Sequence, residues 1–171
     1  MSRNKASLQQ QIIEVLNQLQ SVAKQAANQA HVTATHSESI ARSKYETFGL
    51  EASYLAHGQT HRVAQLQQDI RTIGAMPVCH YTEDDAIDIG ALVFVEDQAQ
   101  MVQALFVSPC AGGVKVSFDC TLFDTDLAVN EVMLITPQSP LGQALMGQYL
   151  DEPLTIQLGN SCKLLEIIAV F

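Results

Sequence analysis

The chain has 171 residues, 47% of them hydrophobic and 16% charged, and a formal net charge of −9. This composition allows a buried core in one ordinary domain or two small ones, and it excludes an intrinsically disordered chain. No apolar run approaches the ~20 residues that a membrane-spanning helix needs. The first residues lack the apolar block of a signal peptide, so we expect a cytoplasmic protein without a membrane partner.

Charge is divided unevenly between the two halves of the chain. Residues 1–78 carry seven basic and five acidic residues, a net charge of +2, whereas residues 79–171 carry two basic and thirteen acidic residues, a net charge of −11. Phosphate contacts require Lys and Arg, so the acidic half is not expected to bind nucleic acid, and the first half is too weakly basic to bind a duplex strongly. We therefore expect protein partners and no direct sequence-specific binding of nucleic acid.

Two heptad patterns predict two helices, one over residues 7–30 and one that runs to about residue 73. Their seams are Leu8, Ile12, Val15, Leu19, Val22 and Ala26, and then Tyr45, Gly49, Ala52, Ala56, Gln59, Val63, Leu66, Ile70 and Ile73. Gly74 and Pro77 follow in the order that is typical of a helix end.

The sizes of the seam residues favour an antiparallel pair. The first helix begins with large side chains and ends with alanines, and the second shows the reverse order. Folded back on itself, the pair places small residues opposite small ones and large opposite large, which fills each layer. Residues 1–78 are therefore expected to form an antiparallel coiled-coil hairpin with its tip at 31–44, in a chain that is a monomer.

Two capping boxes compete for the start of the second helix. Thr35 with Glu38 forms one, and Ser43 with Glu46 forms the other. The first would make Glu38 a structural cap, whereas the second would leave its carboxylate free in the loop. Both alternatives remain open from the sequence.

The periodicity changes near residue 79, and residues 79–171 are predicted to form a second domain. Apolar runs separated by turn residues predict strands at 91–95, 100–107, 113–118, 131–135, 154–158 and 162–170. The predicted fold class is α+β, a helical hairpin followed by a small antiparallel β domain with one short helix.

That short helix lies in the segment from Ser139 to Gly147. Ser139 is suited to the N-cap and Pro140 to the first helical position, where a missing N–H costs nothing. Gly147 can end the helix in a left-handed conformation. The pattern consists of Ser139, Pro140, Leu141, Gly142, Ala144, Leu145 and Gly147.

This pattern, together with the segment from Ser43 to Ala56, resembles the Gre family of bacterial transcript cleavage and elongation factors. The resemblance spans most of the chain and implies an FKBP-like C-terminal domain that binds RNA polymerase. It also implies a coiled coil that enters the secondary channel of the polymerase, where acidic tip residues help to hold a catalytic Mg²⁺. Such a factor has no catalytic activity of its own, because it stimulates cleavage by the polymerase.

The tip departs from the family pattern. Gre factors place two acids three residues apart, shortly before the tyrosine that Tyr45 resembles; here the first falls on Glu38 and the second on Ala41. One carboxylate holds a shared Mg²⁺ more weakly than two, so we expect weak or absent stimulation of cleavage and no tightly bound cofactor. The candidate tip residues are Ser37, Glu38, Ser39, Arg42, Lys44 and Tyr45.

Other patterns receive structural interpretations. His57 and His61 have metal-compatible spacing but no third ligand nearby, and the acidic run from Glu83 to Asp88 lacks the spacing of a calcium loop. The four cysteines form no C-x-x-C pair and are expected to be buried free thiols. The alternative functions are a coiled-coil adaptor and an FKBP-like peptidyl-prolyl isomerase, which would need an aromatic-lined pocket.

Overall fold

The computed structural model describes the chain except for residues 1, 36–42, 124–126, 128 and 159–160. The chain divides into two compact units. The first consists of Met1–Ile12 together with Thr72–Phe171, and the second consists of Ile13–Arg71. The first unit therefore combines the β domain with the beginning of the first helix and the end of the second. The domain boundary predicted at residue 78 follows the change of periodicity and stays a prediction.

The two predicted helices are present as α1 (Ser2–Thr35) and α2 (Ser43–Ala75). Helix α1 continues five residues beyond the predicted end, so the predicted tip at 31–44 was too wide at both ends. The β-branched Thr33 is accommodated because its hydroxyl donates a hydrogen bond to the Gln29 carbonyl, 2.9 Å away. Since Thr35 ends α1, the first of the two capping boxes does not start α2.

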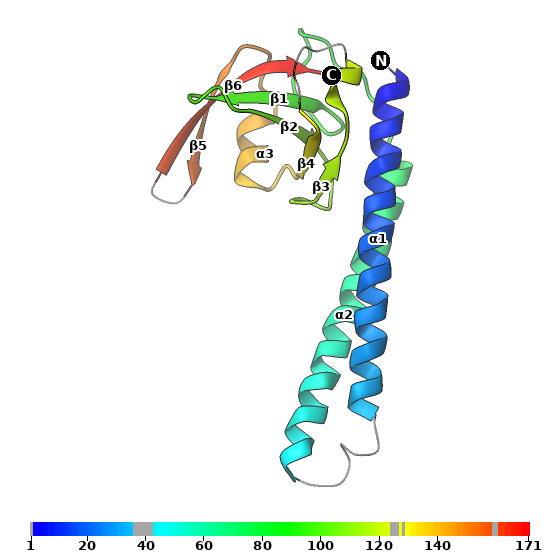
Figure 1. Ribbon diagram of the computed structural model, residues 1–171. Coiled ribbons are helices and arrows are strands. Elements are labelled where there is room, and N and C mark those ends of the chain that lie inside the picture. Colours follow the sequence, from blue (N-terminus) through cyan, green and yellow to red (C-terminus); the bar gives the residue numbers. More distant parts are fainter. Residues whose placement is uncertain (1, 36–42, 124–126, 128, 159–160) are drawn as a thin grey trace. The chain divides into compact units, whose positions relative to one another are not determined.

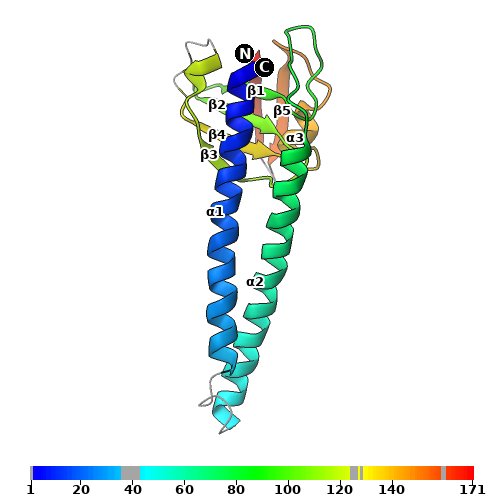
Figure 2. The ribbon, with the colours of Figure 1, turned by 90° about the vertical axis from the view of Figure 1, so that its right-hand side faces the viewer.

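In the second unit the helices pair as predicted, and they run side by side in both views (Figures 1 and 2). The seam of α2 is confirmed at its described positions, since Ala52, Leu66 and Ile73 are buried and the other four are half-buried, while Tyr45 and Gly49 lie outside the residues whose burial is described. The seam of α1 was predicted wrongly beyond Ile12, because Leu16, Gln20 and Ala23 are buried while Val22 is 63% exposed. The remaining predicted positions, Val15, Leu19 and Ala26, are half-buried.

The physical reason lies in the spacing of the buried residues. From Leu8 to Gln20 every fourth residue is buried, and each step of four turns the buried stripe by about 40° around the helix. A heptad seam would instead drift slowly the other way. Apolar residues lie on both stripes of α1, and the heptad stripe was favoured because the buried stripe contains the polar Gln20.

The first unit contains a sheet of six strands in the order β3-β4-β2-β1-β6-β5. The strands are β1 (Leu92–Asp97), β2 (Val102–Val107), β3 (Lys115–Ser117), β4 (Glu131–Ile135), β5 (Pro153–Leu158) and β6 (Ser161–Val170). All six predicted strands are confirmed, and so is the α+β class. The expected antiparallel arrangement needs one correction, because β2 and β4 pair in parallel. Strand β3 follows β2 in the chain but does not pair with it in the sheet. Strand β4 lies between them and pairs with both.

The two faces of the sheet are covered differently. Helix α3 (Pro140–Leu145) places Leu145 in an aliphatic core with Val93, Val95 and Ile167. Phe94 alternates with these valines and so lies on the opposite face. There it belongs to an aromatic cluster with Phe118, Phe123 and Phe171, whose ring centroids are 5.3–5.9 Å apart.

Candidate functional surfaces

The start of α3 is fixed by Ser139. Its Oγ accepts a hydrogen bond from the Gly142 N–H at 3.0 Å and donates one to the Thr136 carbonyl at 2.7 Å. Pro140 occupies the first helical position, as predicted. Gln138, Pro140 and Gln143 are exposed, so the capped turn forms a corner on the protein surface.

Two glycines of the same segment are required by the backbone. A Cβ on Gly142 would lie 1.9 Å from the Thr136 carbonyl oxygen, closer than any real contact. Gly147 has φ +79°, and its N–H donates to the Ile87 carbonyl at 2.9 Å. The seven residues of the predicted pattern thus build this corner and tie it to the loop before β1.

The predicted tip lies mostly outside the described residues. Ser37, Glu38, Ser39 and Arg42 belong to the segment that the structure leaves out, and Lys44 and Tyr45 are described only as backbone in the first turn of α2. The roles of Glu38 and of a shared Mg²⁺ therefore stay predictions from the sequence.

A polar layer interrupts the core of the hairpin. Gln20 is 5% exposed. Its amide nitrogen donates to Gln67 Oε1 at 2.9 Å, and its own oxygen accepts from Lys24 Nζ at 2.8 Å. Because the amide is satisfied on both sides, it can be buried without the penalty of an unpaired polar group. Such a layer fixes which residues of α1 and α2 face each other.

Lys5 joins α1 to the β domain within the first unit. Its side chain is 5% exposed, and Nζ donates to the carbonyls of Cys79 and Gly90, both at 2.8 Å. The ammonium also lies 4.8 Å from the centroid of the Tyr81 ring. Burial lowers the pKa of Lys5 to about 8 and raises the pKa of Tyr81 to about 12.

Gln9 completes this attachment one turn further along α1. Its amide nitrogen donates to the carbonyls of Ile73 and Met76, at 2.6 and 2.9 Å. Ile73 lies in the last turn of α2 and Met76 directly follows the helix, where carbonyls lack the regular helical donor four residues later. The Ile73 carbonyl also accepts a hydrogen bond from the Met76 N–H at 3.2 Å. Lys5 and Gln9 were not predicted, because a single Lys or Gln on a polar helix carries no signal in the sequence.

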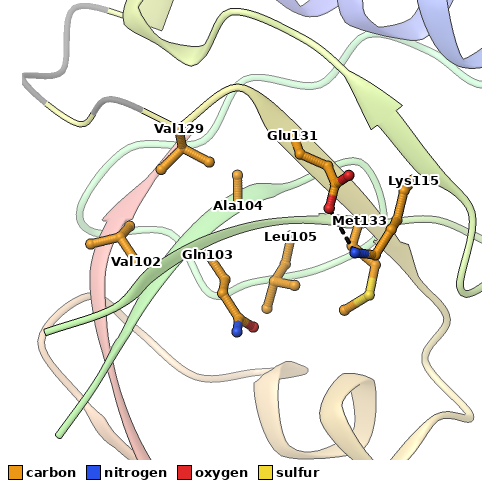
Figure 3. Close-up of a pocket in the computed structure, with 8 residues that line it drawn as sticks. All are labelled: Val102, Gln103, Ala104, Leu105, Lys115, Val129, Glu131 and Met133. Carbon is orange, nitrogen blue, oxygen red and sulfur yellow. Dashed lines mark hydrogen bonds and ion pairs between the residues drawn. The ribbon is translucent and has the colours of Figure 1, made fainter. Parts of the chain in front are cut away.

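A hollow of about 280 Å³ lies on the sheet where β2, β3 and β4 begin (Figure 3). The ion pair between Lys115 and Glu131, 2.7 Å long, stands at its side, with both side chains more than half exposed. The other lining residues are Val102, Gln103, Ala104, Leu105, Val129 and Met133. The exposed ion pair leaves this side of the hollow open to solvent.

The described residues give no support to the isomerase alternative. The face beneath α3 is filled by Leu145, which is fully buried, and the phenylalanine cluster lies on the opposite face.

The acidic turn is a local structure, because Asp85 accepts hydrogen bonds from the backbone N–H and the hydroxyl of Thr82, which lower its pKa.

The other candidate ligands are dispersed. His57 and His61 are exposed on α2, and the described residues contain no group of three potential metal ligands. The four cysteines are free, but only Cys120 is buried, so the prediction of burial was wrong for the other three. None of the helices in the described ranges is long and apolar enough to cross a membrane.

The fold defines a class of protein: a helical hairpin joined to a mixed β domain with one short helix. No protein-family model and no curated protein matches the chain. Among solved structures, the chain is similar to GreA factor homolog 1 (Gfh1) of Thermus thermophilus, at 18% identity over 93% of this chain and 94% of that chain, with a TM-score of 0.37.

The chain is also similar to two further solved structures. Gfh1 of Thermus aquaticus has 18% identity over 92% of both chains, with a TM-score of 0.38. The transcription elongation factor GreA/GreB from Nitrosomonas europaea has 13% identity over 61% of this chain and 78% of that chain, with a TM-score of 0.34.

Proposed function

We propose that this protein is a transcription elongation factor of the Gre type. The FKBP-like β domain binds RNA polymerase, and the helical hairpin enters the secondary channel of the enzyme. The factor acts as a monomer in the bacterial cytoplasm and has no catalytic activity of its own.

The observation that carries this proposal is the capped corner from Ser139 to Gly147 in a chain that begins with a helical hairpin. The corner is the family pattern that the sequence resembles. In the structure its cap, its proline and both glycines occupy positions that their chemistry requires. A pattern in which the cap, the proline and both glycines each have a structural role is more specific to a family than a short helix alone.

The dimensions of the hairpin support insertion into a channel. Helix α1 continues from Ile13 to Thr35 within the hairpin unit, which corresponds to a rod of roughly 34 Å at 1.5 Å per residue. Leu16, Leu66 and the Gln20 layer lie in its interior, so the two helices of the hairpin bury a core of their own.

The chemistry at the tip is proposed from the sequence. Glu38 is the one acid at the two positions where the family has a pair, and Ala41 at the second position offers no ligand atom. A single carboxylate can share a Mg²⁺ with the polymerase but holds it weakly. The factor therefore occupies the channel and stimulates transcript cleavage little or not at all.

Binding is tested first, with the full-length protein and purified bacterial RNA polymerase in a sedimentation or interferometry experiment. We expect a complex that a Gre factor displaces by competition, since both would use the same channel. Absence of binding by the full-length protein would contradict the proposal as a whole.

Cleavage is tested separately, by transcript release from backtracked polymerase. We expect less release than with a two-acid Gre factor, and a further loss in Glu38→Ala. Glu51→Ala is the matched control, because Glu51 is an exposed acid on α2 away from the tip. Strong cleavage that Glu38→Ala abolishes would refute the proposed low activity while leaving polymerase binding intact.

A further inference from the structure

Strand β5 forms an unprotected edge of the sheet. It is the last strand in the order β3-β4-β2-β1-β6-β5 and pairs only with β6 (Figure 1). Within the described part of the chain, no residue outside β6 hydrogen-bonds to its backbone. Alternate N–H and C=O groups of an edge strand point away from the sheet and remain available to another strand.

The opposite edge strand, β3, has features that hinder pairing with another strand. Strand β3 has only three residues, begins with a lysine and carries the ion pair of Lys115 with Glu131. Short length and charge are the usual devices that prevent a further strand from pairing. Strand β5 has six residues, none of them charged, and its only proline is at the first position, where a proline does least to block pairing.

The side chains of β5 leave its outer edge accessible. Leu154 and Ile156 are 3% and 4% exposed and point into the aliphatic core beneath α3, whereas Thr155 is exposed on the other face. The strand is therefore fixed by the core on one face and by its pairing with β6. Its other edge can pair with a further extended strand.

Acidic residues surround the start of this edge. Asp151 and Glu152 precede the strand, and Glu166 on β6 lies directly opposite both Pro153 and Glu96. Like charges directly opposite each other destabilise an antiparallel pair. Asp97 is neutralised by Lys163 at 3.0 Å, but within the described ranges no ion pair neutralises Glu96 or Glu166.

A hollow of about 120 Å³ lies at the same place, lined in part by Glu96, Pro153, Leu164 and Glu166. Its volume corresponds to about four waters. Leu164 is 44% exposed and offers an apolar wall beside the two carboxylates. An apolar wall ending in carboxylates suits Lys or Arg, whose long apolar stem packs while the charged end is neutralised.

We propose that β5 is the binding edge for an extended, basic polypeptide segment. The segment adds as a seventh strand along β5 and directs a Lys or Arg side chain across Pro153 toward Glu166 on the neighbouring strand β6. Glu96 lies one strand further in, on β1, and adds to the negative charge that this side chain meets. This surface lies on the β domain and does not depend on the function of the hairpin tip.

The test uses the full-length protein and three synthetic octapeptides. One alternates Lys and Val, one alternates Glu and Val, and one alternates Lys and Pro, which keeps the positive charge but loses every second backbone N–H and favours a polyproline II helix over a strand. Hydrogen–deuterium exchange reports the amides of β5. We expect the Lys-Val peptide alone to slow exchange at residues 154–157, by at least about fivefold.

Two pairs of variants separate the edge from general attraction to an acidic protein. Thr155→Lys is expected to weaken binding of the Lys-Val peptide and Thr155→Glu to strengthen it, each by about fivefold. Thr155 is exposed, so neither change should disturb the core. Glu96→Gln combined with Glu166→Gln is expected to weaken binding about tenfold without lowering the melting temperature, because it also removes the opposed charges.

Several results would overturn the proposal. These are equal protection of β5 by the Glu-Val or Lys-Pro peptide, protection by the Lys-Val peptide that maps elsewhere, or no effect of the paired changes at Thr155. Protection of β5 that rises with protein concentration in the absence of peptide would identify a second copy of the chain as the occupant instead.

Discussion

At the scale of single residues, the structure separates positions that are recognisable in the sequence from those that are not. Ser139, Gly142 and Gly147 are recognisable because a cap, a close backbone approach and a positive φ each demand a particular residue type. Lys5 is not, since its role depends on carbonyls about 75 and 85 positions away in the chain. Local chemistry leaves a sequence signature, whereas long-range contacts of an ordinary side chain leave none.

Replacement of Gly142 by alanine is expected to destabilise the protein by about 3 kcal/mol or more, because its Cβ would overlap a backbone carbonyl that cannot move cheaply. Gly58→Ala is the control with the opposite sign. Gly58 lies within α2 with no heavy atom near its would-be Cβ, so alanine should stabilise by roughly 0.5–1 kcal/mol. Urea unfolding of both variants checks the pair, and equal effects would contradict this account.

Lys5 predicts a dependence of stability on alkaline pH. Its pKa in the folded protein is about 8, below the ordinary 10.5, so between these values the unfolded chain binds more protons. The stabilising contribution is therefore fully present above pH 10.5 and is lost as pH falls through 8. The unfolding free energy of the natural protein minus that of Lys5→Met should rise by up to about 3 kcal/mol between pH 7.5 and 10.5.

Chemical denaturation of both proteins at several pH values gives this difference directly. The raised pKa of Cys120 causes stability to fall at high pH, but it acts on both proteins and cancels in the subtraction. The Tyr81 ring lies 4.8 Å from the Lys5 ammonium, so both proteins also carry Tyr81→Phe to remove its titration from the comparison. A difference that stays flat with pH would show that the Lys5 charge is not buried in the folded state.

At the scale of elements, strands were easier to predict than the seam of α1. Alternating apolar residues between clear turns indicated every strand, although not the parallel pairing of β2 with β4, because pairing order is a long-range property. In α1 the wrong stripe was chosen because Val15, Leu19 and Val22 fit the heptad while the buried stripe contains Gln20. Hydrophobic patterning assigns a polar residue such as Gln20 to the surface. Gln20 can nevertheless be buried, because its amide nitrogen donates a hydrogen bond to Gln67.

Gln20→Leu is expected to raise the melting temperature of the hairpin, equivalent to roughly 1 kcal/mol, because a buried leucine gains more than the polar layer provides. The same change should loosen the pairing of α1 with α2, seen as increased self-association in sedimentation equilibrium. Gln18→Leu, at an exposed position of α1, should do neither. A marked loss of stability in Gln20→Leu would show that the hydrogen bonds of the layer are net stabilising.

At the scale of the whole molecule, the first unit is assembled from both ends of the chain. Leu8 and Ile12 are fully buried, and Lys5 and Gln9 bind backbone that lies more than 60 positions later. The sequence pointed to a boundary near residue 78, where the periodicity changes. Compactness instead groups the first twelve residues with the β domain.

A deletion experiment distinguishes these divisions. Residues 79–171 alone should unfold without a cooperative thermal transition, since they lack the side chains of α1 that complete the unit. A chain that joins residue 12 to residue 72 through a short Gly/Ser linker should fold cooperatively, because the Gln9 side chain already bonds to Ile73 within the unit. Circular dichroism on heating checks both; cooperative folding of 79–171 alone would favour the boundary at 78.

The attachment of α1 through Lys5 and Gln9 also sets an order of events during synthesis. Residues 2–12 leave the ribosome before their partners in the β domain exist. The Gly90 carbonyl that Lys5 binds is made 85 residues later, and the Leu122 carbonyl that Asn4 binds is made 118 residues later. The helices of Ile13–Arg71 can pair early, because their contacts are complete once residue 71 has emerged. Residues 2–12 therefore stay unpacked until the sheet has formed, and Leu8 and Ile12 are exposed to chaperones during this time.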